Sequence, residues 1–208
     1  MSPVYHADIA QGTPEWHALR AGKFSASKGA VIMGKLDTSG LADYLKTLAW
    51  ERVYGPTADE GFKSAAMDRG HQVEPEARDW YAFERDVAVE EVGCVEHGRI
   101  PNLIWSPDGL FASRRRGIEI KSPLHKAWME VKRTGLIPSE YRWQTKFGLF
   151  IGELDGEDFV SYHPQAGGLV IPCEITDSEK DQIEARIFVL EPKVQAWVEL
   201  LTDKKDAA

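Results

Sequence analysis

The sequence contains only two cysteines, Cys94 and Cys173, among its 208 residues. Two thiols are too few for a disulfide framework or for a cysteine-rich metal cluster. No apolar run approaches the roughly 18 residues needed to span a bilayer, and the first residues lack the basic start and apolar stretch of a secretory signal. We therefore expect a reduced, cytoplasmic protein without a membrane segment.

Positive charge is also scarce, because 25 Lys and Arg face 33 Asp and Glu and leave a net charge of −8. Taken as a whole, this balance argues against nucleic acid as a partner. The distribution differs from the total: residues 114–146 hold nine basic and three acidic residues, a local +6, against −14 for the remainder. Such a run is either a solvated basic face or a binding surface for phosphate groups.

The apolar pattern fits one domain over residues 1–208. Helical spacing, caps and stop signals favour helices, and β-rich stretches favour strands, with "RRRG" as a hairpin connection between two of them. Pro75 either begins a new helix or kinks one. The pattern predicts an α/β (α+β) fold with a central mixed sheet flanked by helices. The expected helical segments are 14–34, 41–55, one that ends near 85, 139–153 and 176–201. The expected strand segments are 86–97, 102–111, 117–123, 158–164 and 167–175.

The stretch "GIEIKSP" places an acid and a base on one face of a strand. Alternation puts Ile118 and Ile120 on one face and Glu119 and Lys121 on the other. Asp108 precedes Glu119 at hairpin spacing, so the two carboxylates can converge on Mg²⁺ or Mn²⁺, with the Ile120 carbonyl as a further oxygen. A nearby lysine can orient a water for phosphodiester hydrolysis. The alternative is an exposed Glu/Lys pair on an edge strand.

Four blocks occur in order over residues 15–151: "EWHALRAGKFSAS", "RGHQVEPEAR", "SPDGL" followed by "GIEIKSP", and "YRWQTKFGLFI". Together they resemble the PD-(D/E)XK nuclease superfamily and, within it, the lambda exonuclease or YqaJ-type viral recombinases. The resemblance implies a restriction-endonuclease-like core. It also implies a 5′-to-3′ exonuclease that degrades one strand of linear double-stranded DNA and leaves 3′ single-stranded overhangs for recombination by strand annealing.

The same resemblance implies cofactors and partners. The cofactor would be Mg²⁺, with two ions and with Mn²⁺ as a possible substitute. The chain would form a homotrimeric ring around linear duplex DNA and act with a single-strand annealing protein. A phage or prophage origin in a bacterial host is implied as well.

Site residues follow from the resemblance position by position. The metal ligands would be Asp108, Glu119 and the backbone carbonyl of Ile120, with Glu74 acting through a water. Lys121 would position the attacking water. The full catalytic set would be Glu74, Asp108, Glu119, Lys121 and Gln144.

Substrate contacts are implied in the same way. The 5′-phosphate pocket would contain Arg20, Ser27, Ser106 and Gln144. This suits their chemistry, because a guanidinium grips phosphate bidentately and a serine-capped helix start offers N–H groups to an anion. Met67 either wedges between terminal base pairs or packs in the core. The remaining DNA contacts would be Tyr141, Arg114, Arg115 and Arg116.

Two other readings stay open. One is a different PD-(D/E)XK nuclease, such as a RecB-like end processor, although the iron–sulfur variants need four cysteines. The other is a non-catalytic DNA-binding protein with the same fold. The joint presence of Asp108, Glu119 and Lys121 disfavours it, because a chain free of catalytic demand has no reason to place three charges there.

Overall fold

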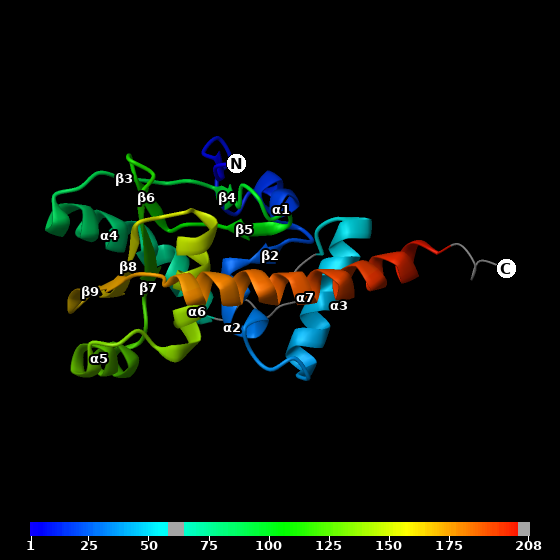
Figure 1. Ribbon diagram of the computed structural model, residues 1–208. Coiled ribbons are helices and arrows are strands. Elements are labelled where there is room, and N and C mark those ends of the chain that lie inside the picture. The colour runs from blue at the N-terminus through cyan, green and yellow to red at the C-terminus, as the bar shows by residue number, and fades with distance from the viewer. Residues whose placement is uncertain (58–64, 204–208) are drawn as a thin grey trace.

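The computed structural model describes residues 1–57 and 65–203, apart from the side chains of 65–68 and 71. Two sheets lie side by side between helices (Figure 1). The strands are β1 (Val4–His6), β2 (Phe24–Ser25), β3 (Val89–Glu90), β4 (Cys94–Glu96), β5 (Leu103–Trp105), β6 (Gly109–Phe111), β7 (Arg116–Lys121), β8 (Gly156–His163) and β9 (Gly167–Cys173). The helices are α1 (Pro14–Arg20), the 3₁₀ turn η1 (Ala26–Lys28), α2 (Gly29–Ile32), α3 (Ser39–Tyr54), α4 (Ala65–Arg85), α5 (His125–Thr134), α6 (Ser139–Ile151) and α7 (Asp177–Thr202).

The larger sheet has the order β3-β6-β7-β8-β9 and is mixed, since β7 and β8 are parallel and the other neighbours antiparallel. The smaller sheet has the order β1-β4-β5-β2. The predicted α/β class is confirmed, and the "RRRG" hairpin forms between β6 and β7. The predicted mixed sheet flanked by helices is confirmed in the larger sheet, and the smaller sheet is an addition that the sequence pattern did not predict.

The division occurs inside two stretches that each read as one strand. Segment 86–97 contributes β3 to the larger sheet and β4 to the smaller one, and segment 102–111 contributes β5 and β6 in the same way. Gly93 marks the first break, where a Cβ would lie 2.0 Å from the Ile9 carbonyl oxygen. Pro107 marks the second, where a residue without an N–H interrupts the ladder. Residues 106–108 therefore lie at the junction of the two sheets.

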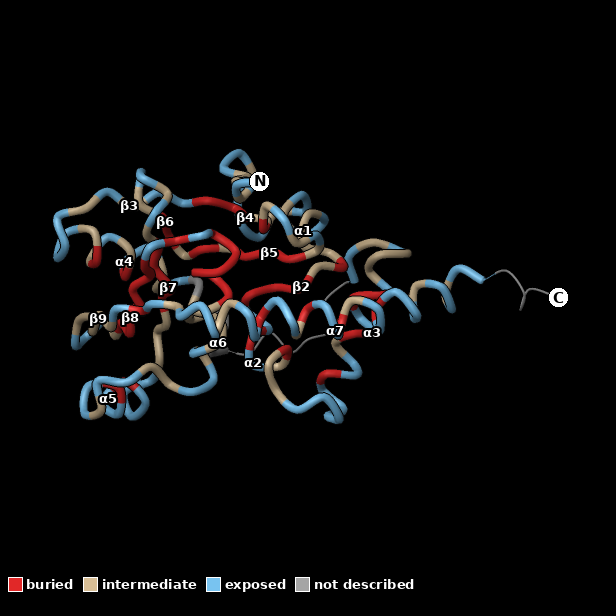
Figure 2. The backbone as a smooth tube through the Cα atoms, in the orientation of Figure 1, coloured by how far each residue is buried: buried red, intermediate tan, exposed pale blue. Residues whose placement is uncertain are grey.

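Both faces of the larger sheet are covered. Ile118 and Ile120 pack with Ala77 and Tyr81 of α4, so the alternation predicted for β7 is confirmed. The opposite face contributes Phe159 to the main core, which it shares with α6, the smaller sheet and α7. Figure 2 shows buried backbone concentrated in the strands, while α5 and the far end of α7 are largely exposed.

Several helix predictions are confirmed in detail. Helix α3 ends at Gly55, whose φ of 86° suits glycine. Helix α7 begins with the capping box of Thr176 and Glu179. Pro75 lies inside the continuous helix α4, so a new helix does not begin there. Helix α5 was not predicted. None of the helices in the described part of the chain is long and apolar enough to cross a membrane.

Candidate active site

The end of β7 carries a buried acid beside a base. Glu119 is fully buried, and β7 is a central strand between β6 and β8, so an exposed pair on an edge strand is ruled out. Its Oε1 atom accepts hydrogen bonds from the Lys121 ammonium and from Gln144 Nε2, the latter at 2.5 Å. Gln144 comes from α6. The structure thus brings Glu119, Lys121 and Gln144 together, as predicted.

Asp108 lies directly before β6, where the β6–β7 register of Gly109 with Ile118 places it next to Glu119. The backbone N–H of Ile120 donates to Asp108 Oδ2 at 2.6 Å. The loop behind it is held by Gln11, whose Nε2 donates to the Pro107 carbonyl at 2.8 Å. The spacing read from the sequence therefore corresponds to a real convergence of two carboxylates.

Glu74 reaches this group from α4 through an arginine. Arg78, one turn further along the helix, donates from NH2 to Glu74 Oε1 at 2.7 Å and from Nε to the Asp108 carbonyl at 2.7 Å. It also pairs with Glu91. Arg78 was missed by the sequence analysis, although its position four residues after Glu74 in "EPEAR" was the available signal.

The electrostatics reflect excess buried negative charge. Burial, followed by the Asp108 charge, raises the pKa of Glu119 to about 8 and that of Glu74 to about 7. Burial lowers the pKa of Lys121, but the Glu119 and Asp108 carboxylates outweigh it and leave that pKa raised. Lys121 therefore stays protonated, and the carboxyl groups favour an added cation.

A divalent cation fits the donor set. Glu119 Oε2 is buried and has no hydrogen-bond partner in the described part of the chain, so one carboxylate oxygen is left for a ligand. Asp108 supplies a second hard oxygen donor. Among the described residues, no three His, Cys, Asp or Glu side chains form a ready-made ligand set. Asp108 and Glu119 would therefore need the Ile120 carbonyl, water or substrate oxygens to complete the coordination.

A further acid, Glu157, lies behind the site. It pairs with Gly117 in the β7–β8 register, and both of its carboxyl oxygens are buried without a hydrogen-bond partner in the described structure. Burial, then the charges of Glu119 and Asp108, raise its pKa well above the usual range. Gly148 of α6 makes room for it, because a Cβ there would lie 3.0 Å from Glu157 Oε1. In the sequence, "GEDF" resembles an ordinary strand with a surface acid, so nothing signalled Glu157.

A second polar cluster surrounds Arg20 at the end of α1. Its NH1 donates to Ser106 Oγ at 2.7 Å and its NH2 to Ser25 Oγ at 2.8 Å. Ser25 Oγ lies 3.0 Å from Ser27 Oγ, and Trp16 stacks on the guanidinium 4.3 Å from its ring centroid. The predicted Arg20, Ser27 and Ser106 therefore lie together, with Ser25 as an unpredicted member. The serine-capped helix start expected here does not form, because Ser25 precedes η1 without a side-chain cap hydrogen bond and Lys28 precedes α2.

Two connections hold the clusters next to each other. Ser106 and Asp108 belong to one short loop, with one residue in each cluster. Gly29, at the start of α2, lies against the backbone of α6, and a Cβ there would be 3.0 Å from Gln144 N and 2.8 Å from the Trp143 carbonyl carbon. Gln144 therefore stands at the boundary between the two clusters.

The other predicted DNA contacts do not all lie near this site. Tyr141 is near the site, with its ring centroid 5.3 Å from Lys121 Nζ. The arginines of the hairpin lie at the opposite end of β7 from Lys121, so the structure does not bring them to this site. They form ion pairs instead: Arg114 with Glu90, Arg115 with Asp155 and Arg116 with Asp158. The side chain of Met67, on α4, lies outside the described residues.

The raised pKa of Glu119 predicts how Glu119→Gln changes stability without divalent ions. An acid with a raised folded pKa stabilises the fold below its unfolded value of 4.5, and this contribution is lost as the pH rises toward about 8. Glutamine cannot ionise. The melting temperature of the variant minus that of the wild type should therefore increase by a few degrees as the pH rises from about 5 to about 8. Thermal melts in chelator measure this, with the exposed Glu15→Gln as control. A difference that stays constant with pH contradicts the prediction.

Known proteins share this fold and sequence pattern. The chain matches the YqaJ-like viral recombinase domain over residues 15–155. The alkaline exonuclease LHK-Exo from Laribacter hongkongensis is 30% identical, with a TM-score of 0.82 over 91% of this chain and 96% of that one. Its complex with dAMP gives 31% identity and the same score and coverage.

A phage-related exonuclease from Haemophilus somnus, 14% identical with a TM-score of 0.65 over 86% of this chain and 96% of that one, shares the fold. None of the curated proteins matches. The domain match extends over most of the chain, and its boundaries enclose the Arg20 cluster together with Glu74, Asp108, Glu119, Lys121 and Gln144. The chain therefore belongs to the YqaJ-like viral recombinase family.

Proposed function

We propose that this protein is a Mg²⁺-dependent 5′-to-3′ exonuclease that degrades one strand of linear double-stranded DNA and leaves 3′ overhangs. The observation that carries the proposal is the Asp108–Glu119–Lys121 cluster around the buried Glu119, whose Oε2 atom has no hydrogen-bond partner among the described residues. The similarity to LHK-Exo, an alkaline exonuclease with a dAMP complex, supports the same activity. A RecB-like end processor is the alternative, and it would differ in strand polarity.

Asp108 and Glu119 would hold the cation, with the Ile120 carbonyl as a further oxygen and Glu74 acting through a water. When bound, Mg²⁺ would favour deprotonation of the attacking water and neutralise charge on the phosphoryl group. Lys121 stays protonated beside Glu119, so it would position that water and stabilise phosphate charge rather than remove a proton. Gln144 fixes Glu119 Oε1 through its hydrogen bond.

The Arg20 cluster would bind the 5′ end. A partly buried guanidinium that already contacts two serine hydroxyls offers a fixed fork to a phosphate. Its attachment to the catalytic cluster through the 106–108 loop would place a bound 5′ terminus beside the reacting bond. The proposal includes a homotrimeric ring on the duplex and a single-strand annealing partner that receives the 3′ overhang.

Digestion assays with Mg²⁺ test the activity. Linear duplex with a 5′-phosphate should be degraded, and covalently closed circles should be spared because they offer no terminus. End-labelled strands report polarity. A label at the 5′ end should be released before a label at the 3′ end of the same strand. Equal cutting of circles, or removal of nucleotides from the 3′ end, would refute the proposed exonuclease.

Lys121→Ala should reduce turnover by at least about 100-fold, because it removes the group that positions the nucleophile. DNA binding, measured by fluorescence anisotropy in Ca²⁺, should change little. The exposed Lys193→Ala on α7 is the matched control. Near wild-type turnover in Lys121→Ala would remove this lysine from the mechanism.

Arg20→Ala should reduce the preference for 5′-phosphorylated over 5′-hydroxyl ends by about tenfold, equivalent to the loss of a charge-assisted hydrogen bond. Because Arg20 is largely buried, the exposed Ser27→Ala provides a milder variant with a smaller effect in the same direction. Arg99→Ala, exposed on another loop, is the control. Initial rates on the two substrates give the ratio, and an unchanged ratio in both variants would show that the phosphate site lies elsewhere.

A further inference from the structure

The loop that follows Lys121 is held by an arginine of α4. Arg69 donates from NH2 to the Ser122 carbonyl at 3.0 Å and to the Pro123 carbonyl at 2.7 Å. Ser122 and Pro123 come directly after Lys121, the last residue of β7. Hydrogen bonds from an ionised donor are stronger than those between neutral groups. The two bonds therefore fix the backbone next to the Lys121 side chain.

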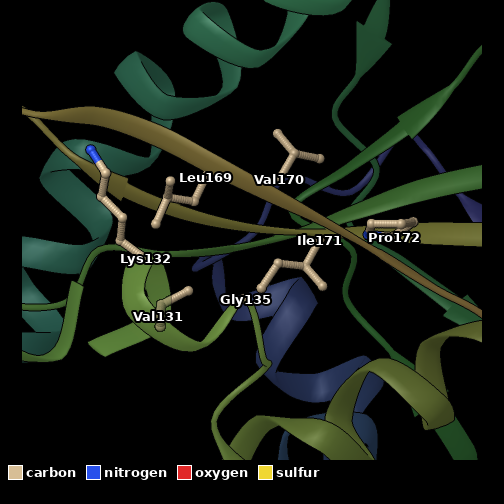
Figure 3. Close-up of a pocket in the computed structure, with 7 residues that line it drawn as sticks. All are labelled: Val131, Lys132, Gly135, Leu169, Val170, Ile171 and Pro172. Carbon is tan, nitrogen blue, oxygen red and sulfur yellow. The ribbon is translucent and has the colours of Figure 1, made fainter. Parts of the chain in front are cut away.

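The other end of this loop has weaker support. It leads into α5, in which the buried residues are Trp128 and Val131. Trp128 Nε1 donates to the Ser161 carbonyl at 3.2 Å and ties α5 to β8. The end of α5 borders a hollow of about 240 Å³, with Leu169 and Ile171 of β9 on the opposite wall (Figure 3). Because α5 is attached through so few side chains, its packing does little to position the loop.

Helix α4 holds the backbone of the site at two places. Arg78 donates to the Asp108 carbonyl directly before β6, and Arg69 donates to the carbonyls directly after β7. Strands β6 and β7 are antiparallel, so the start of β6 and the end of β7 lie at the same edge of the sheet. Glu74 lies between the two arginines in the sequence of α4. One helix thus fixes both chain segments from which the site is built.

We propose that Arg69 is a positioning residue for Lys121. By binding the two carbonyls that follow Lys121, Arg69 holds the end of β7 so that the lysine ammonium keeps its place beside Glu119. This role rests on the proposed nuclease function, in which Lys121 positions the attacking water. Arg69 acts through the backbone of Lys121, so its removal affects turnover and leaves DNA binding intact. A direct contact of Arg69 with a DNA phosphate would instead weaken binding.

Steady-state kinetics with linear duplex DNA separate these two roles. Arg69→Ala should lower kcat by about 10- to 100-fold, because a small misplacement of a catalytic group has an effect of this size. The Kd for DNA, measured by anisotropy in Ca²⁺, should stay within about twofold of wild type. Arg85→Ala is the matched control, since Arg85 is exposed in the last turn of the same helix. It should leave both quantities unchanged.

Rescue separates positioning from a general loss of structure. Arg69→Lys keeps a charged donor on a shorter side chain and should recover part of the lost rate. Millimolar guanidinium added to Arg69→Ala should also recover part of it, because Arg69 is only partly buried and a free ion can reach the two carbonyls. Sodium chloride at the same ionic strength should not. Guanidinium weakens folded states, so such a recovery cannot come from a more stable fold.

Hydrogen exchange tests the contact without reference to activity. In Arg69→Ala without DNA, the amides of residues 121–126 should exchange at least about tenfold faster, while those of α7 stay unchanged. If wild type fails to degrade linear DNA, the proposed function is wrong, and unchanged exchange would show separately that Arg69 does not hold the loop. Three other results would overturn the proposal: an unchanged kcat, weaker DNA binding at an unchanged kcat, or a loss of rate that neither lysine nor guanidinium restores.

Discussion

The hydrogen bond from the Ile120 N–H to the Asp108 carboxylate is the constraint on which the site depends. It fixes a loop residue to the central strand at the point where the chain passes from the smaller sheet to the larger. A loop without this bond could place its carboxylate away from Glu119. The Arg78 contact with the Asp108 carbonyl holds the same residue from α4. Strand, loop and helix are thus joined at one acid.

Burial gives these charges their chemical character. Glu119 is surrounded by a packed core, where an ionised carboxyl is costly unless compensated. Lys121 and Gln144 compensate one of its oxygens, and the other has no partner in the part of the chain that the structure describes. Glu157 adds another buried carboxyl on the neighbouring strand. The strand is consequently stable enough to form, while its charged end remains suited to binding a cation.

Local pattern was enough to predict much of this. The alternation in "GIEIKSP" and the spacing from Asp108 identified which side chains share a face, because strand geometry is regular. The break of two strand-like stretches between sheets was not predictable, since it depends on where Gly93 and residues 106–108 meet distant backbone. Glu157 was not predicted for the same reason, because its burial depends on the close approach of α6 at Gly148.

The contact of Gly29 with the backbone of α6 has a consequence for substrate geometry. No side chain lies between the start of α2 and the main chain at Trp143 and Gln144, so the separation of the Arg20 cluster from the Glu119 cluster is set by two backbones in van der Waals contact. Side-chain substitutions can alter the chemistry at either end without altering this interval. The distance between the two clusters is therefore a property of the backbone, and it is set independently of the side chains that each cluster contains.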